Sequence, residues 1–197
     1  MVERISNKII DYQIEKGIIS KNDINIYRYG YILLFEVMIN ILISLGIGII
    51  LGKVTEILFF LACFIILRSF CGGYHANSIW KCVFLSNLVM AISILSNILL
   101  SKYTIPISLF FILEMCFSII ICVLSPVDNK NKRLSSNEKS FYKKCTIIVS
   151  VAENSIGIIL MLFNKQEYAY LVLFVFLIQM VSLMIVKGQN KLINEIL

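Results

Sequence analysis

Long apolar runs alternate with short polar segments along almost the whole chain. Six of these runs approach or reach the length that a helix needs to cross the hydrocarbon core of a bilayer. They cover residues 27–51, 54–67, 82–100, 105–124, 145–163 and 168–186, and the second can be extended through Phe70. We therefore predict an all-α, polytopic integral membrane protein with about six transmembrane helices. Residues 1–197 are expected to form a single membrane domain, with the bundle at 27–186.

The first 26 residues follow a different pattern. Between residues 3 and 19, isoleucines recur at helical spacing and charged side chains fall between them. This pattern is typical of an amphipathic helix that lies on a membrane surface. There is no apolar core of a cleavable signal peptide here. Residues 187–197 are expected to form a short amphipathic tail.

The composition excludes a soluble domain of this length. The chain is 59% hydrophobic and only 15% charged, with a mean hydropathy of +0.88. Six cysteines show no paired spacing of a secreted disulfide framework, and the net charge is +6. In a membrane protein such an excess belongs mostly to cytoplasmic loops, so it does not indicate a nucleic-acid partner.

The distribution of basic residues predicts the orientation. With six spans both termini lie on one side, and 15 of the 18 basic residues fall on that side, leaving only Lys53, Lys102 and Lys165 opposite. Basic residues stay cytoplasmic. The termini, the segment between the second and third spans, and a long polar loop at 125–144 are therefore expected to face the cytoplasm.

One polar stretch, Arg68–Cys82, stands out between the second and third spans. It holds the only histidine of the chain, His75, which follows Gly72 and Gly73. A thiol becomes a useful nucleophile when a neighbouring group takes its proton, and imidazole is the usual partner. The glycines tolerate backbone angles that other residues avoid, so His75 can fold back over the start of the next helix.

The position of Cys82 in that helix depends on the helix cap. If Asn77 is the cap, Cys82 lies in the second turn, where the helix dipole and Lys81 favour the thiolate only modestly. A chance pairing of a histidine with a cysteine remains an alternative. So does a zinc site from Cys71, His75 and Cys82, although it lacks a fourth ligand. We predict no metal and no cofactor, and we expect the other four cysteines to be packing residues.

Three carboxylates lie inside the predicted spans, at Glu36, Glu114 and Glu153. Ionisable groups in lipid are costly and face a partner or a cavity. For Glu153, with Asn154 beside it, we favour an interhelical hydrogen bond that fixes packing. The residues alone thus leave three functions open: a thiol enzyme, a small transporter or peptide-export component without protease activity, and a structural or regulatory subunit.

The motif narrows this choice. Arg68, then Gly72-Gly73-Tyr74-His75-Ala76, then Cys82, set between hydrophobic spans, resembles the accessory gene regulator protein B family. These are membrane cysteine endopeptidases that process the precursor of a cyclic quorum-sensing peptide. The segment Ser-Pro-Val-Asp at 125–128, followed by Lys130, Lys132 and Arg133, is similar to the family's proline-then-basic cytoplasmic loop. Length, number of spans and motif order agree over nearly the whole chain.

The resemblance implies roles for the matched positions. Cys82 would be the nucleophile and His75 the base, Arg68 and Gly73 would be further required positions, and the substrate-facing loop would contain Lys130, Lys132 and Arg133. The partner would be a small precursor with an amphipathic N-terminal helix and an acidic C-terminal tail, in a bacterial cell membrane. The enzyme would remove the tail through an acyl-thioester and promote ring closure to a thiolactone or lactone. A homodimer is left open.

Overall fold

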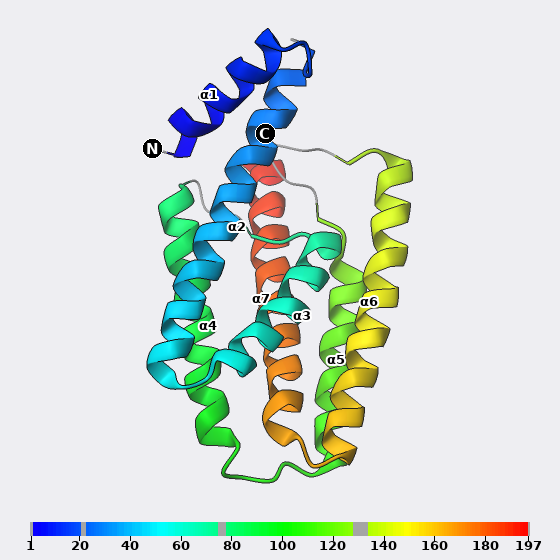
Figure 1. The fold of residues 1–197 in the computed structure, drawn as a ribbon. Coiled ribbons are helices and arrows are strands. Elements are labelled where there is room, and N and C mark those ends of the chain that lie inside the picture. Colours follow the sequence, from blue (N-terminus) through cyan, green and yellow to red (C-terminus); the bar gives the residue numbers. More distant parts are fainter. Residues whose placement is uncertain (1, 21–22, 75–77, 128–133, 197) are drawn as a thin grey trace.

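The computed structural model describes residues 2–20, 23–74, 78–127 and 134–196. Within these ranges there are seven helices and no strands (Figure 1). Their bounds are α1 Val2–Glu15, α2 Ile24–Leu51, α3 Val54–Cys71, α4 Ile79–Leu100, α5 Ile107–Leu124, α6 Ser136–Leu162 and α7 Gln166–Ile196. The predicted all-α class is confirmed.

Six of these helices, α2 to α7, are long and apolar enough to cross a membrane. The six predicted spans are thereby confirmed, most of them to within a few residues at each end. A run of about 20 apolar residues is a local property of the chain, and lipid tolerates it only as a helix with its backbone polar groups paired internally.

The short N-terminal helix is present as well. Its residue Ile10 is buried, and Asn7 and Gln13, which lie three residues before and after it on the same face, meet the start of α2. There the Arg28 side chain donates to Asn7 Oδ1 at 3.1 Å, and Gln13 Nε2 donates to the Tyr31 hydroxyl at 2.7 Å. Helix α1 is therefore bound to the first turns of α2.

Three predicted boundaries were wrong. The polar loop expected at 125–144 ends early because α6 begins at Ser136. Helix α4 begins at Ile79 and not at residue 82, with Ser78 as the N-cap; Asn77, the predicted cap, lies outside the described residues. Helix α7 does not stop at residue 186 but continues to Ile196. Hydropathy alone marks the apolar part of a helix, whereas backbone hydrogen bonding carries a helix on into polar sequence.

The early start of α6 has a local cause. The Ser135 side chain accepts the Glu138 N–H, and the Glu138 carboxylate accepts the Ser135 N–H, which completes a capping box. This pairing satisfies two amides that a helix start otherwise leaves open.

Replacing Ser135 by alanine removes this cap, and we expect it to lower the free energy of unfolding by about 1 kcal/mol. The measurement is thermal unfolding in detergent, with Ser136→Ala as the matched control because Ser136 is not the capping residue. Equal stability of the two variants would contradict the capping role.

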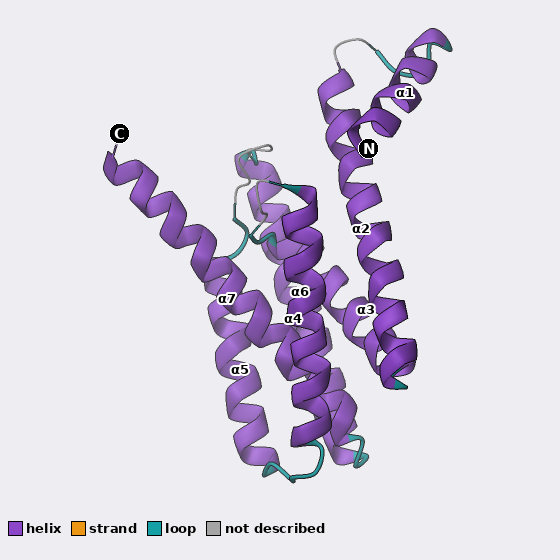
Figure 2. Cartoon of the chain, turned by 90° about the vertical axis from the view of Figure 1, so that its left-hand side faces the viewer, coloured by secondary structure: helices purple, strands orange, loops and turns teal. Residues whose placement is uncertain are grey.

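Helix α7 lies in the middle of the bundle and contacts α3, α4, α5 and α6 (Figure 1). Its first half is fully buried along Ala169–Val172 and again at Val175 and Phe176. A helix that is apolar on every side fits such a central position. Helix α2, with α1, stands at one edge of the molecule (Figure 2), where it packs against α3 and α4.

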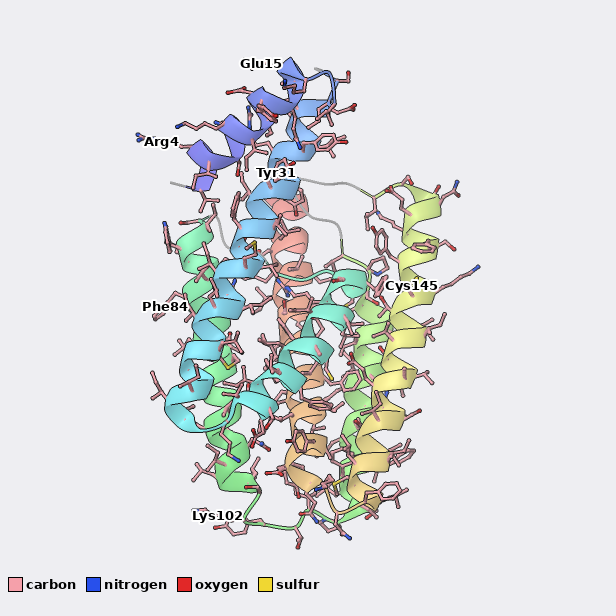
Figure 3. All side chains as sticks on the ribbon, in the orientation of Figure 1. Arg4, Glu15, Tyr31, Phe84, Lys102 and Cys145 are labelled. Carbon is pink, nitrogen blue, oxygen red and sulfur yellow. The ribbon has the colours of Figure 1, made fainter. Side chains whose placement is uncertain are left out.

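Large apolar side chains cover the outside of the bundle. Figure 3 shows Phe84 pointing outward from α4, and 69% of its surface is exposed. Comparable residues are Leu42 and Ile50 on α2, Val123 on α5 and Ile148 on α6. A soluble protein rarely exposes so much apolar surface, and these faces are suited to lipid acyl chains.

Polar side chains join helices inside the bundle, as is common where lipid offers no hydrophobic drive for association. Asn87 on α4 donates to Asn40 Oδ1 at 2.7 Å and accepts from Ser44 Oγ at 3.0 Å, which ties α4 to α2. In the connection between α2 and α3, the Lys53 ammonium group donates a hydrogen bond to the Glu56 carboxylate and forms a 2.5 Å salt bridge with it. This hydrogen bond raises the pKa of the Lys53 ammonium group above its ordinary value.

The helix ends fall into two groups. The starts of α2, α4 and α6 and the ends of α3, α5 and α7 lie in the half of the molecule that also holds α1 (Figure 1). The connections at 52–53, 101–106 and 163–165 lie in the other half. The Arg68–Cys82 stretch and the segment after α5 therefore share the half that contains both termini.

Candidate active site

The site begins where α3 ends. Gly72 terminates α3 with φ 73°, and its N–H donates to the Arg68 carbonyl at 3.0 Å. A Cβ added at Gly72 would lie 3.1 Å from the Val127 carbonyl oxygen. The Val127 N–H in turn donates to the Cys71 carbonyl at 3.3 Å. A glycine is needed here because the backbone angle is left-handed and the segment after α5 approaches closely.

Helix α7 supports the same turn from the other side. Gln179, which is fully buried, donates through Nε2 to the Gly72 carbonyl at 2.6 Å and to the Cys71 sulfur at 2.8 Å. The carbonyl groups at the end of a helix have no partner within the helix. Gln179 supplies a partner for this turn, and it also engages the Cys71 thiol.

One helical turn further along α7, a second set of contacts holds the chain just before His75. Arg68 Nη1 donates to Ser182 Oγ at 3.1 Å, and Arg68 Nη2 donates to the Tyr74 carbonyl. The Tyr74 N–H donates to the same Ser182 oxygen at 2.9 Å. We call Arg68, Tyr74 and Ser182 the α3–α7 clasp. It fixes both polar groups of the Tyr74 backbone.

Gly73 has no room for a side chain inside this clasp. Its φ is 152°, and a Cβ there would collide with Arg68 Nη1 and lie 2.7 Å from Ser182 Oγ. Both atoms are already held by hydrogen bonds, so neither can move away without breaking one.

Replacing Gly73 by alanine is therefore expected to disrupt the clasp. For the peptidase activity that the family resemblance implies, we expect turnover to fall by about tenfold, from roughly 1–2 kcal/mol of backbone strain and displaced hydrogen bonds. Gly46→Ala is the matched control, because nothing lies within 4 Å of a Cβ at that position. The measurement is the rate of precursor cleavage by protein in vesicles. Turnover equal to that of Gly46→Ala would contradict the role of the clasp.

Cys82 lies near the start of α4. Its N–H donates to the Ser78 carbonyl at 3.0 Å, which is the first hydrogen bond of the helix ladder. The amides of Ile79, Trp80 and Lys81 precede that bond and have no partner within the helix. The Cys82 side chain is buried, with 8% of its surface exposed. His75 lies outside the described residues.

Two cavities meet at Cys82. The α2-side cavity, about 300 Å³, lies among α2, α3, α4 and the segment after α5, and its polar lining includes Tyr29, Glu36 and Asn40. The α7-side cavity, about 200 Å³, lies among α3, α4 and α7 and has a mostly apolar lining. Four residues line both, namely Phe64, Arg68, Cys82 and Ser86. Arg68 is a cationic neighbour of the Cys82 thiol.

The predicted basic loop lies largely outside the described residues, since Lys130, Lys132 and Arg133 are not among them. Its two flanks line the α2-side cavity through Pro126, Val127 and Leu134. Lys143, which was expected in the loop, lies in α6 and donates to the Ser125 carbonyl at 2.9 Å and to the Cys122 carbonyl. A cation at this position pairs with the last carbonyl groups of α5.

The carboxylates inside the spans differ in their surroundings. Glu36 lines the α2-side cavity. Glu114 and Glu153 are buried between helices, and their carboxyl oxygens have no hydrogen-bond partner among the described residues. The interhelical bond predicted for Glu153 is made by its neighbour instead, since Asn154 Nδ2 donates to Ser118 Oγ at 2.9 Å.

The described residues contain no group of three or more His, Cys, Asp or Glu side chains that could hold a metal ion. His75 is not among them, so the zinc arrangement considered from the sequence falls outside what the structure describes.

The structure brings together Arg68, Gly73 and Cys82 and adds two residues that sequence reasoning missed, Gln179 and Ser182. Both are polar residues in an otherwise apolar span, spaced three apart and so on one face of α7. That is a signal for an inward-facing site in a membrane helix. The sequence does not reveal which loop they meet.

The family model for accessory gene regulator B matches residues 2–183. No curated protein and no solved structure matches the chain. The matched range spans the six candidate membrane helices up to the last turns of α7, together with the Arg68–Cys82 stretch and the clasp. Proteins of this family are peptidases that process autoinducing peptides. This multi-pass membrane protein, with its polar turn held between α3 and α7, belongs to the accessory gene regulator B (AgrB) family.

Proposed function

We propose that this protein is a membrane cysteine endopeptidase that removes the C-terminal tail of a small precursor peptide and promotes cyclisation of the remainder. Cys82 is the nucleophile and His75 the general base and acid. The observation that carries the proposal is the position of Cys82, at the start of a helix and at the junction of two cavities. A substrate chain that passes such a junction has its scissile bond beside the thiol.

The α3–α7 clasp supports the role of His75. It holds the N–H and the carbonyl of Tyr74, the residue directly before the histidine. A general base needs a defined position relative to its nucleophile, because proton transfer requires hydrogen-bond distance. The fixed Tyr74 backbone and the fixed start of α4 hold both ends of the short segment that contains His75.

The reaction proceeds in two steps. His75 takes the proton of the Cys82 thiol, and the sulfur attacks the carbonyl carbon before the tail. The carbon–nitrogen bond then breaks, His75 returns the proton to the leaving amine, and the acyl group stays on sulfur as a thioester. In the second step His75 takes the proton of a thiol or hydroxyl of the precursor, and that sulfur or oxygen attacks this carbonyl. The carbon–sulfur bond to Cys82 breaks, and the proton returns from His75 to the Cys82 sulfur. The product is a thiolactone or lactone.

The first turn of α4 is suited to stabilise the oxyanion of both steps. The amides of Ile79, Trp80 and Lys81 have no partner within the helix, and they lie at the positive end of its dipole. Amides fixed in this way stabilise developing negative charge without reorganising during the reaction.

The basic loop would receive the acidic tail. Lys130, Lys132 and Arg133 supply positive charge next to the flanks that line the α2-side cavity. The attraction is screened by salt, so it contributes more to the approach of the tail than to tight binding. The excess of basic residues in this half of the protein supports a cytoplasmic orientation for both termini and the active site.

Mass spectrometry of the purified protein in lipid vesicles tests the proposal. Wild-type protein mixed with a synthetic precursor of the family should release the tail and carry an acyl adduct on Cys82. His75→Ala should form neither product nor adduct. Tail release without any adduct on Cys82 would rule out the covalent mechanism.

Vesicles with the precursor also distinguish this function from the alternative of a transporter. The buried carboxyl groups of Glu114 and Glu153, which have no hydrogen-bond partner among the described residues, favour that alternative. Glu153→Gln is expected to cleave the precursor as the wild type does. Absence of precursor cleavage by wild-type protein, together with movement of the precursor across the vesicle membrane that Cys82→Ser retains and Glu153→Gln loses, would favour transport over proteolysis.

A further inference from the structure

We infer that the α7-side cavity binds the apolar side chain on the acyl side of the scissile bond, and that the precursor reaches it sideways from the lipid between α4 and α7. The inference rests on the proposed function and assigns a substrate subsite within it.

The lining of the cavity indicates the kind of side chain it accepts. Its walls include Phe60, Val89 and Met90 from α3 and α4 and Ile178 from α7. Ser44, Arg68, Ser86 and Ser182 make up the small polar part of the lining. Such a surface gains free energy chiefly by removing apolar groups from water. A cavity of about 150 Å³ lined by similar side chains holds a benzene molecule, so about 200 Å³ suits one side chain of the size of leucine or phenylalanine.

The two cavities differ in a way that assigns the two sides of the substrate. After cleavage the acyl part stays bound to Cys82, and water must be kept from the thioester until the ring closes. The apolar α7-side cavity is suited to exclude water. The α2-side cavity carries Glu36, Asn40 and Tyr29 and reaches the flanks of the basic loop, so it suits the departing polar tail.

The α7-side cavity also borders the outer surface of the bundle. Leu85 on α4 and Val181 and Ile185 on α7 line it, and each has more than two fifths of its surface exposed, at 42%, 44% and 45%. In a membrane-spanning helix such exposed faces contact lipid. A membrane-associated peptide can therefore bring an apolar side chain to Cys82 without passing through water.

Filling the cavity from its lipid edge tests this assignment. Val181→Phe adds bulk at the lining, and Met184→Phe is the matched control because Met184 is equally exposed on α7 but does not line the cavity. The substrates are three synthetic precursors of the family with alanine, leucine or phenylalanine directly before the scissile bond. Wild type and Met184→Phe should prefer the large residues over alanine by roughly ten- to a hundredfold in kcat/KM. Val181→Phe should lose this preference to within about twofold.

Two results would overturn the inference. An unchanged preference in Val181→Phe would show that the cavity does not hold this side chain, as expected if a lipid acyl chain occupies it. A photoreactive phenylalanine analogue before the scissile bond should cross-link to Ile178, Val181 or Ile185. Cross-links to Tyr29 or Val37 instead would put the acyl side in the α2-side cavity.

Detection of the Cys82 adduct distinguishes failure of the subsite assignment from failure of the proposed function. If wild-type protein forms the adduct but Val181→Phe discriminates as wild type does, the subsite assignment fails and the proposed function stands. If wild-type protein forms no adduct while the tail is released, the proposed function fails at the nucleophile.

Discussion

Replacing Cys82 by alanine is expected to abolish precursor cleavage, with a fall in kcat on the order of 10⁴-fold or more, as found when the nucleophile of a covalent protease is removed. In the proposed mechanism the thiol supplies the bond that holds the acyl group, and no other group replaces that covalent intermediate. The measurement is single-turnover release of the tail from a synthetic precursor in vesicles, followed with time by mass spectrometry.

The matched control is Cys63→Ala. Cys63 is buried to the same extent as Cys82, at 7% against 8% exposed, and lies on α3. The two variants remove the same atom from the core of the bundle, so they should lower the stability by similar amounts. Cys63→Ala should keep the cleavage rate within a few fold of wild type. Comparable loss in both variants would indicate damage to the fold, and residual fast cleavage by Cys82→Ala would exclude Cys82 as the nucleophile.

Arg68→Lys is expected to lower kcat by roughly ten- to a hundredfold with little change in KM. The guanidinium group donates from two nitrogens, to Ser182 Oγ and to the Tyr74 carbonyl. A lysine ammonium keeps the charge but lacks the fixed fork that spans two acceptors. One acceptor then loses its charged partner, and an unsatisfied buried polar group costs about 1–3 kcal/mol. The loss should appear in kcat because the clasp holds the backbone of Tyr74, directly before the residue that acts as the base in the proposed mechanism.

A second arginine provides the control for this exchange. Arg28 on α2 donates to Asn7 at an exposed position far from Cys82 in the sequence. Arg28→Lys should therefore leave both kcat and KM unchanged. The comparison uses steady-state cleavage over a range of precursor concentrations. A rise in KM alone for Arg68→Lys would mean that Arg68 contacts the substrate and does not act through Tyr74.

Some features of this structure follow from local signals in the sequence, and others from contacts between residues far apart in the chain. The start of α6 follows from a local signal, although the hydropathy of the chain does not reveal it. Ser135 and Glu138 are three residues apart, and that spacing alone predicts a capping box. The cap of α4 is also local, but Asn77 and Ser78 are both good N-cap residues and stand next to each other. Sequence alone could not choose between them.

The partners of the active-site turn are set by long-range contacts. Gln179 and Ser182 are recognisable as polar residues of an apolar span, but their contacts with Gly72 and Tyr74 join positions more than 100 residues apart. Which loop faces them depends on the rotation of α7 about its axis. That rotation is set by packing against four helices at once.

The six spans, the motif from Arg68 to Cys82 and the need for glycine near its turn can all be predicted from the sequence. Each of these follows from the length of an apolar run or from a short-range pattern, and the bilayer allows little else for such runs. The place of Cys82 between two cavities of different polarity, and the packing of α7 against the site, could not be predicted without the folded structure. These features arise where side chains from separate helices meet, because helix packing within lipid depends on side-chain shape and hydrogen bonding rather than on hydrophobicity.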